Sequence, residues 1–423
     1  MSAATIEGLL WIIVAATIAP ILADIIPKIT VPVVVLEILI GILFGPQILG
    51  WIQHSEGLEI AKEFGVIFLF FLAGFEVDYA GIKGDPLRNA LKGWVFSLAL
   101  ALILCFILQQ AGLISSFHLV AIAICTTALG PLMPILTDSG QLPTPFGNNV
   151  LSIGALGEFL PVLALAFLFN SSRTGFVTAL AIIGFFAVSA AALIFFRRVV
   201  GQNENSHIRR IAIETLDSSA QFAVRLSILV LVGLVYLAAR FDLDVLLGAF
   251  AGGFIIGQIG DVASTVESRK VMEWMKTKLE AIGFGVFIPA FFVMTGADFQ
   301  LDTLFGSTRA MIIVPLTVIA FLVVRGLPVL LGYRAFGQTM RWRLALVAST
   351  QLPLVATLMG RFIEGGQVPQ DIATAIIGGS VLTVAIFPIL AFANMEKPGK
   401  RINGNGEEEK VIEALPEMAV AKN

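Results

Sequence analysis

Charged residues are scarce in this 423-residue chain, at 13% of the sequence. Water-soluble proteins carry about a quarter charged residues, so the composition excludes an ordinary soluble globular protein. Hydrophobic residues make up 57% of the chain, and most of it must face lipid or other apolar helices. We therefore expect an all-α polytopic membrane protein. The N-terminus lacks a basic region, and its first apolar run is long enough to span, so we expect no cleavable signal peptide.

Cysteine and histidine are also rare. The two cysteines, Cys105 and Cys125, lie in apolar runs, where cysteine behaves as a small hydrophobic residue rather than a disulfide or metal ligand. The three histidines, His54, His118 and His207, show no ligand spacing, so we expect no bound metal and no cofactor. The net charge of −3 gives no indication of a nucleic-acid partner.

Thirteen segments are apolar over the roughly 20 residues that a membrane-spanning helix needs. They cover residues 6–26, 31–50, 58–77, 87–112, 116–137, 147–169, 175–197, 217–239, 242–258, 280–297, 308–332, 341–362 and 370–394. With an odd number of spans, nearly all loop Lys and Arg residues fall on the side of the C-terminus. That bias predicts an N-terminus outside and a cytoplasmic C-terminus.

The spans divide into a membrane domain, residues 1–395, and a tail, residues 396–423. Within the membrane domain, inverted repeats over about 6–169 and 217–394 flank a linker helix at 175–197. The polar tail is expected to be mostly disordered. Two amphipathic basic loops, "NENSHIRRIAIETLDSSAQ" and "DVASTVESRKVMEWMKTKLEA", are expected to lie along the membrane surface.

Helix-breaking residues interrupt the fifth and twelfth spans. Gly130, Pro131 and Pro134 lie within "CTTALGPLMPILTDSG", and Pro353 follows polar residues in "VASTQLPLVATLMG". Proline removes a backbone donor and clashes with the preceding turn, so the freed backbone groups need protein or a water-filled cavity. Two kinked helices without a transport role are one interpretation. Their equivalent places in the two halves favour an inverted-repeat transporter with broken, crossing helices and a midplane site.

Four ionisable side chains lie well inside predicted spans: Glu37, Glu158, Arg225 and Arg325. A charge at the bilayer centre costs about 2.5–3.5 kcal/mol on insertion scales, so each side chain is either paired or functional. One interpretation is two structural ion pairs, in which each carboxylate meets one arginine. We expect Glu37 and Arg225 to form structural ion pairs. Glu158 is the deepest and has a functional interpretation.

Burial of Glu158 favours its protonated form, and a cation arriving beside it would compete with that proton. One site with two exclusive occupants and two access states makes an antiporter. The broken helices would supply the hydroxyl and carbonyl oxygens that monovalent cations prefer, and Arg325 would pair with Glu158 when the cation is absent. The predicted cation- and proton-binding residues are Glu158, Thr126, Thr127, Gln351 and Ser349.

Several short motifs follow one another along the membrane region. They are "GILFGP" (41–46), "FLFFLAGFEVD" (68–78), "TTALGPLMPIL" (126–136), "GEFLPVLAL", "QFAVRLSILVL" (221–231), "LLGAFAGGFIIG" (246–257), "FIPAFFVMTGADF" (287–299) and "VLTVAIFPILA" (381–391). With these motifs the chain resembles the bacterial monovalent cation:proton antiporters of the Kef type, in the wider sodium/proton exchanger superfamily.

The resemblance implies a thirteen-helix homodimer with a dimerisation domain and a core domain that moves like an elevator. It places the essential carboxylate at Glu158 and the basic residue of the eleventh span at Arg325. The chain departs from the family pattern at Glu158, where aspartate is usual, at Gly157, where Asp, Asn or Gln is common, and at "STQLPL" in the twelfth span. We also expect no cytosolic nucleotide-binding domain of the Kef kind, because the tail at 396–423 is too short to form one. A single carboxylate favours electroneutral exchange.

The expected function is therefore exchange of Na⁺ or K⁺ for H⁺ across the cell (inner) membrane, and not an enzymatic reaction. Membrane lipid, the two ions and a second copy of the chain are the expected partners. The main alternative is a channel-like or uniport pathway in which Glu158 and Arg325 form a structural ion pair. A membrane sensor and an organic-anion symporter are further alternatives. A sensor would need a larger output domain, and a symporter would favour arginine over a lone carboxylate.

Overall fold

The computed structural model describes residues 3–25, 32–77, 84–142, 144–168, 180–191, 194, 220–262, 266–393, 395, 400–402 and 408–410. The regular secondary structure of this part is helical except for one short antiparallel ladder, in which Lys400–Ile402 (β1) pairs with Glu408–Lys410 (β2). The expected disorder of the tail otherwise falls outside the described residues. So does the first amphipathic loop, apart from its last two residues.

The first half comprises α1 (Ala3–Ile25), α2 (Val33–Phe44), α3 (Glu56–Phe75), α5 (Asp85–Gln110), α6 (Phe117–Ala123), α7 (Leu132–Asp138) and α8 (Pro145–Leu168). A short apolar helix follows at Leu180–Ala191. The second half comprises α11 (Ala220–Arg240), α12 (Val245–Val262), α13 (Val266–Ile282), the π-helix η1 (Gly283–Phe287), α14 (Ile288–Ala297), α15 (Leu301–Gly306), α16 (Thr308–Phe321), the π-helix η2 (Leu322–Gly326), α17 (Leu327–Gly332), α18 (Gln338–Ala348), α19 (Pro353–Glu364) and α20 (Gln370–Phe392).

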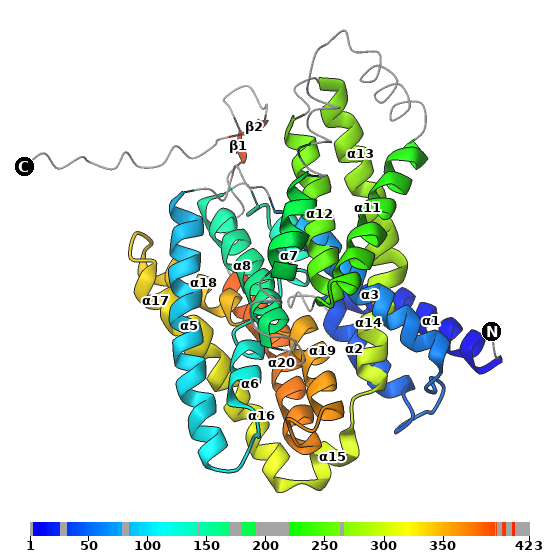
Figure 1. Ribbon diagram of the computed structural model, residues 1–423, viewed down its shortest axis with the longest axis vertical. Helices are drawn as coiled ribbons and strands as arrows, with labels where there is room; N and C mark the ends of the chain where they lie inside the picture. The colour runs from blue at the N-terminus through cyan, green and yellow to red at the C-terminus, as the bar shows by residue number, and fades with distance from the viewer. Residues whose placement is uncertain are drawn as a thin grey trace, which may run out of the picture.

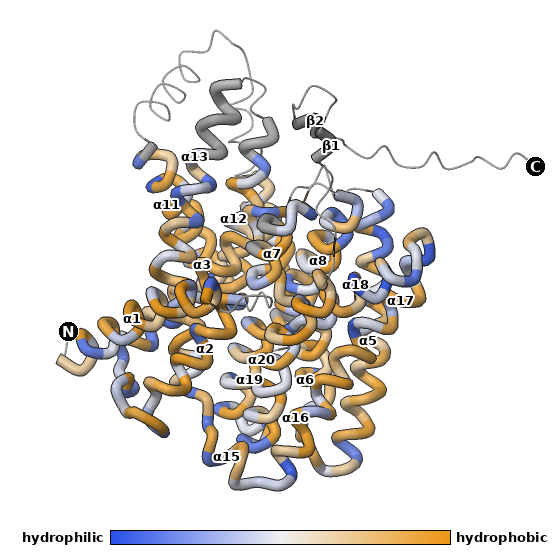
Figure 2. Tube along the Cα trace, turned by 180° about the vertical axis from the view of Figure 1, so that it is seen from behind, coloured by the Kyte–Doolittle hydropathy of each residue, from blue (hydrophilic) through white to orange (hydrophobic). Residues whose placement is uncertain are grey.

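Eight helices in the described part are long and apolar enough to cross a membrane, and shorter apolar helices add to them. Each of the thirteen predicted ranges contains a helix or a pair of half-helices. Hydrophobic residues cover most of the helical surface, and hydrophilic residues gather near the helix ends (Figure 2). The chain is therefore an all-helical, multi-pass membrane protein, as its composition predicts.

Two predicted boundaries were wrong. The span expected at 31–50 ends at Phe44, because Gly45 adopts an extended backbone and Pro46 cannot continue the helix. The second amphipathic loop is not a separate surface segment, since most of it forms α13, which continues through η1 into α14. Trp274–Gly306 is thus one long apolar stretch, and the tenth span begins well before residue 280.

The helices gather into two groups (Figure 1). In one group α2 packs against α14, α3 against α12, α1 against α2 and α11 against α12. In the other, α5 packs against α8 and α16 against α20. Spans 1–6 correspond to spans 8–13, and each contact has a counterpart under this correspondence. The α2–α14 contact corresponds to α3–α12, α1–α2 to α11–α12, and α5–α8 to α16–α20. The same holds between the groups, where α12 meets α8 and α2 meets α20. The packing therefore follows an inverted repeat.

Glycines allow the closest of these contacts. A Cβ atom on Gly253 of α12 would lie 1.8 Å from the carbonyl oxygen of Phe71 in α3. At the repeat-related contact, a Cβ atom on Gly296 of α14 would lie 2.1 Å from the carbonyl oxygen of Ile38 in α2. Only glycine lets the backbones approach so closely, which is a common packing device in membranes.

Candidate functional site

The two broken helices cross in the interior. The α6 helix ends at Ala123 and α7 begins at Leu132, while α18 ends at Ala348 and α19 begins at Pro353. The non-helical stretches bond directly to each other, because the backbone N–H of Ala128 donates to the carbonyl oxygen of Thr350 at 2.8 Å. The two non-helical stretches thus satisfy part of each other's backbone hydrogen bonding, which a buried break requires.

Three of the residues predicted for the cation path meet at this crossing. The Thr126 hydroxyl donates to Gln351 Oε1 at 3.1 Å, and Gln351 Nε2 donates to the carbonyl oxygen of Ile124 at 2.9 Å. The Thr127 hydroxyl donates to the carbonyl oxygen of Ala348 at 2.7 Å. All three side chains are buried. The crossing is therefore held by side chains as well as by backbone bonds.

Ser349, the remaining predicted polar residue, is also buried. Its hydroxyl donates to the carbonyl oxygen of Ala345 in its own helix at 2.7 Å. A position missed from the sequence lies beside it: the Thr383 hydroxyl of α20 accepts from the backbone N–H of Gln351 at 3.0 Å and lies 2.7 Å from the carbonyl oxygen of Ser380. The sequence feature that could have identified Thr383 is its place as a polar residue within the apolar run "GGSVLTVAIFP".

Glu158 lies on α8 facing the crossing, with 3% of the residue exposed. Its Oε1 atom accepts from the backbone N–H of Leu129 at 2.8 Å. Its Oε2 atom is buried and has no hydrogen-bond partner among the described residues. The neighbouring carbonyl oxygen of Gly157 accepts from the backbone N–H of Thr127 at 3.1 Å. The carboxylate is thus held at the break before α7 through its Oε1 atom.

Arg325 lies in η2 and is also 3% exposed. Its Nε and Nη2 atoms donate to the Thr127 hydroxyl at 3.0 and 2.6 Å, and its Nη1 atom donates to the Ser97 hydroxyl of α5 at 3.3 Å. No ion pair joins it to Glu158 within the described residues. Arg325 is therefore linked to the carboxylate region through Thr127. Ser97 is a second contact that sequence reasoning missed.

Gly157, the position that departs from the family pattern, lies between these groups. A Cβ atom there would be 2.7 Å from Thr127 Cβ and 2.9 Å from Arg325 Nη2. A larger side chain at this position requires Thr127 or Arg325 to move. The guanidinium thus takes the space that a second polar side chain would otherwise need.

The structure does not bring Glu37 and Arg225 together with the crossing or with each other. Glu37 is buried in α2, whereas Arg225 lies on the exposed face of α11. Neither forms an ion pair within 4 Å in the described part of the chain. The described residues therefore do not form the structural ion pairs expected for Glu37 and Arg225.

A cavity of about 480 Å³ lies between α3, α13, η1 and the break before α7. Its lining comprises Leu69, Leu72, Ala73, Glu76, Gly130, Met133, Thr277, Glu280, Ala281, Phe284 and Gly285. Lys276 lies 2.8 Å from Glu76 and 3.7 Å from Glu280. Gly130 follows Leu129, the residue whose N–H binds Glu158. The cavity therefore reaches the backbone that holds the carboxylate.

Known proteins with similar sequences and folds agree with this arrangement. A family model described as "Sodium/hydrogen exchanger, transmembrane" matches residues 13–395. The putative Na⁺/H⁺ antiporter YjbQ of Bacillus subtilis (strain 168) is 26% identical over 97% of this chain, which spans 66% of that relative. The Na⁺/H⁺-K⁺ antiporter GerN of Bacillus cereus is 27% identical over 84% of this chain and 88% of its own length.

A solved structure of the sodium proton antiporter MjNhaP1 from Methanocaldococcus jannaschii superposes with a TM-score of 0.67. The match covers 93% of this chain and 97% of that chain, at 16% identity, and so establishes a shared fold. Because the family model covers almost all of the membrane region, this chain belongs to the transmembrane sodium/hydrogen exchanger family.

Proposed function

We propose that the chain exchanges a monovalent cation, Na⁺ or K⁺, for H⁺ across the cell membrane, with Glu158 as the carboxylate that the two ions share. Family membership supports antiport, and the relatives bear the names of Na⁺/H⁺ and Na⁺/H⁺-K⁺ antiporters. These names are of transporters rather than enzymes. The proposal includes the Kef-type subfamily and an electroneutral one-for-one stoichiometry, because the site offers one carboxylate.

The proposal rests on the hydrogen bonding of the Glu158 carboxylate, in which the two oxygens differ. Glu158 Oε1 is held by the N–H of Leu129, whereas Oε2 is buried and has no hydrogen-bond partner among the described residues. An unsatisfied acceptor or an unpaired charge is costly away from water. A proton on Oε2 removes the charge, and a cation beside Oε2 balances it. The site is thus suited to alternate between these two occupants.

The nearby oxygens would complete a cation site. Monovalent alkali ions prefer oxygen ligands, and the crossing provides the hydroxyl of Thr126 and the amide oxygen of Gln351. The Thr127 hydroxyl would join them once Arg325, which donates to it in this conformation, moves away. Ser349 supports the end of α18 through its bond to Ala345. Arg325, the expected charge partner of Glu158, would act on the site through Thr127, whose hydroxyl accepts from its guanidinium.

The cavity beside Gly130 would be the access route. Glu76 and Glu280 give its lining a negative charge that attracts cations, and Lys276 partly offsets that charge. The distribution of Lys and Arg in the loops supports a cytoplasmic location for this end, with the N-terminus outside, in the cell (inner) membrane. A homodimer with an elevator-like movement of the α5–α8 and α16–α20 group is part of the same proposal.

A channel-like or uniport pathway with a structural Glu158–Arg325 ion pair is less well supported. The two side chains form no ion pair within the described residues, and each is bonded to a different part of the crossing. A structural role would predict a fully satisfied carboxylate, which differs from the geometry of Oε2.

Purified Glu158→Gln protein in proteoliposomes tests the proposal. The amide keeps the shape and can hydrogen-bond, but it cannot bind and release a proton. We expect normal folding and complete loss of proton movement driven by Na⁺, K⁺ or the other alkali cations. Glu37→Gln is the matched control, because it neutralises another buried glutamate away from the crossing. Exchange by Glu158→Gln at the rate of the unaltered protein would remove Glu158 from the mechanism.

A further inference from the structure

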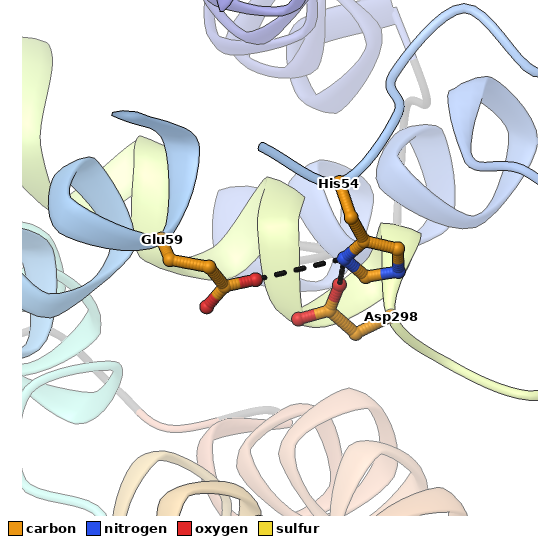
Figure 3. A group of neighbouring side chains, drawn as sticks. All are labelled: His54, Glu59 and Asp298. Carbon is orange, nitrogen blue, oxygen red and sulfur yellow. Dashed lines mark ion pairs between the residues drawn. The ribbon is translucent and has the colours of Figure 1, made fainter. Parts of the chain in front are cut away.

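A second group of ligand-type side chains lies away from the crossing, where three segments meet (Figure 3). His54 precedes Ser55, the N-cap residue of α3, Glu59 lies in the first turns of α3, and Asp298 follows α14. His54 Nδ1 is 3.6 Å from Glu59 Oε1 and 3.4 Å from Asp298 Oδ1. All three ligand atoms lie within 4.8 Å of one another. One nitrogen and two oxygens thus lie close enough together to contact one ion.

Hydrogen bonding within the protein does not account for this convergence. Asp298 Oδ1 is buried and has no hydrogen-bond partner among the described residues. Lys62 engages the opposite oxygens, because its Nζ lies 2.5 Å from Asp298 Oδ2 and 3.7 Å from Glu59 Oε2. Lys62 therefore orients both carboxylates from behind and leaves Oδ1 and Oε1 directed at His54. This arrangement orients ligands in the way that outer-shell groups do in metal sites.

We propose that His54, Glu59 and Asp298 bind a transition-metal dication of the Zn²⁺ type. Zinc–nitrogen and zinc–oxygen bonds of about 2.0–2.2 Å place tetrahedral ligand atoms roughly 3.3 Å apart. The two separations from His54 Nδ1, 3.4 and 3.6 Å, are close to that value. An imidazole with carboxylates suits Zn²⁺, whereas Ca²⁺ and Mg²⁺ take oxygen ligands. Three protein ligands leave the fourth position to water.

Charge also permits a dication here. The two carboxylates and Lys62 sum to one negative charge when His54 is neutral, so a bound dication leaves one positive charge. Asp298 ends α14, and the C-terminal end of a helix favours a cation. The metal would tie the start of α3 to the end of α14, two helices that already pack together. The site uses no residue of the crossing, so the proposal is independent of the transport function.

The histidine spacing in the sequence gave no indication of this site, because its ligands are far apart along the chain. His54 and Glu59 are separated from Asp298 by more than half of the sequence. Packing of α3 on α14 brings them together.

Co²⁺ absorption of purified, tag-free full-length protein tests the proposal, because four- or five-coordinate Co²⁺ gives visible bands much stronger than those of hydrated Co²⁺. We expect such bands, and we expect Zn²⁺ to displace them. His54→Ala should remove the bands and weaken Zn²⁺ binding at least about tenfold. The His54 side chain is 60% exposed, so the variant should fold. Asp298→Asn should have the same effect, and His118→Ala is the control that keeps both signals.

A thermal measurement gives a second readout. Zn²⁺ should raise the unfolding temperature of the unaltered protein and of His118→Ala, but not that of His54→Ala, because a ligand that binds only the folded state stabilises it. Absence of the cobalt bands in the unaltered protein would overturn the proposal. Equal bands or equal Zn²⁺ stabilisation in His54→Ala would overturn it as well.

Discussion

The Thr127 hydroxyl is the most heavily used side-chain group at the crossing, and Thr127→Val deletes it at nearly constant volume. The hydroxyl accepts from two nitrogens of Arg325 and donates to the carbonyl oxygen of Ala348. In the valine variant, the buried guanidinium keeps only the longer bond to Ser97. Thr126→Val, at the adjacent position, deletes a single neutral bond to Gln351. Both substitutions therefore delete one threonine hydroxyl, but they should lower the free energy of unfolding by very different amounts.

Hydrogen bonds to charged groups contribute about 1.5–3 kcal/mol each, and neutral ones about 0.5–1.5 kcal/mol. Thr127→Val deletes two hydrogen bonds to the charged guanidinium, which keeps its bond to Ser97. We therefore expect Thr127→Val to lower the free energy of unfolding by about 3–5 kcal/mol and Thr126→Val by about 1 kcal/mol. The lower stability of Thr127→Val should also reduce its yield, so its effect on cation affinity must be measured on the folded fraction.

Unfolding of the purified variants in detergent, followed by denaturant or heat, measures both losses. Arg325→Met in the Thr127→Val background provides a double-mutant cycle. Removing both partners should cost less than the sum of the single changes, because no buried charge is then left unpaired. Equal losses in the two valine variants, or additive losses in the cycle, would show that the Thr127–Arg325 contact contributes little to stability.

Three further predictions concern Gly157, Glu37 and Lys276. Gly157→Ala should impair exchange in folded protein, because its Cβ would lie 2.7 Å from Thr127 Cβ and 2.9 Å from Arg325 Nη2. The control is Gly360→Ala, whose Cβ meets nothing within 4 Å. Normal exchange by Gly157→Ala would contradict the packing argument. Glu37→Gln should fold at least as well as the unaltered protein and retain exchange, because Glu37 has no ion-pair partner in the described residues; a well-folded variant without transport would assign Glu37 a transport role. Lys276→Met should lower the KM for the cation applied from the cavity side, since Glu76 and Glu280 lose their cationic neighbour. Lys278→Met removes the same charge from the same helix, where Lys278 lies over Trp274, and an equal change in both variants would exclude a local effect.

Much of the fold could be predicted from the sequence because a membrane imposes a simple rule. Spanning helices must be long and apolar, so the thirteen ranges could be identified from hydrophobicity alone. Prolines and glycines likewise marked the two breaks, because their effect on a helix is local. The continuation of α13 into α14 was missed, since an amphipathic segment rich in Lys and Glu resembles a surface helix.

The roles of the polar residues depended on tertiary structure. The sequence singled out Glu158, Thr126, Thr127, Gln351 and Arg325 because polar groups are costly in an apolar span. It could not determine that Arg325 bonds to Thr127 and Ser97 rather than to Glu158. It also could not reveal that Asp298 joins His54 and Glu59.

What the sequence alone determined was the class of protein, the approximate place of its helices, and which polar side chains lie in apolar spans. These follow from hydrophobicity and backbone sterics, which act over one or two turns of helix. Only the tertiary structure decided which buried groups meet. Hydrogen bonds and ion pairs depend on distances of a few ångströms between residues as far apart in the chain as Thr127 and Arg325, and helix packing fixes those distances.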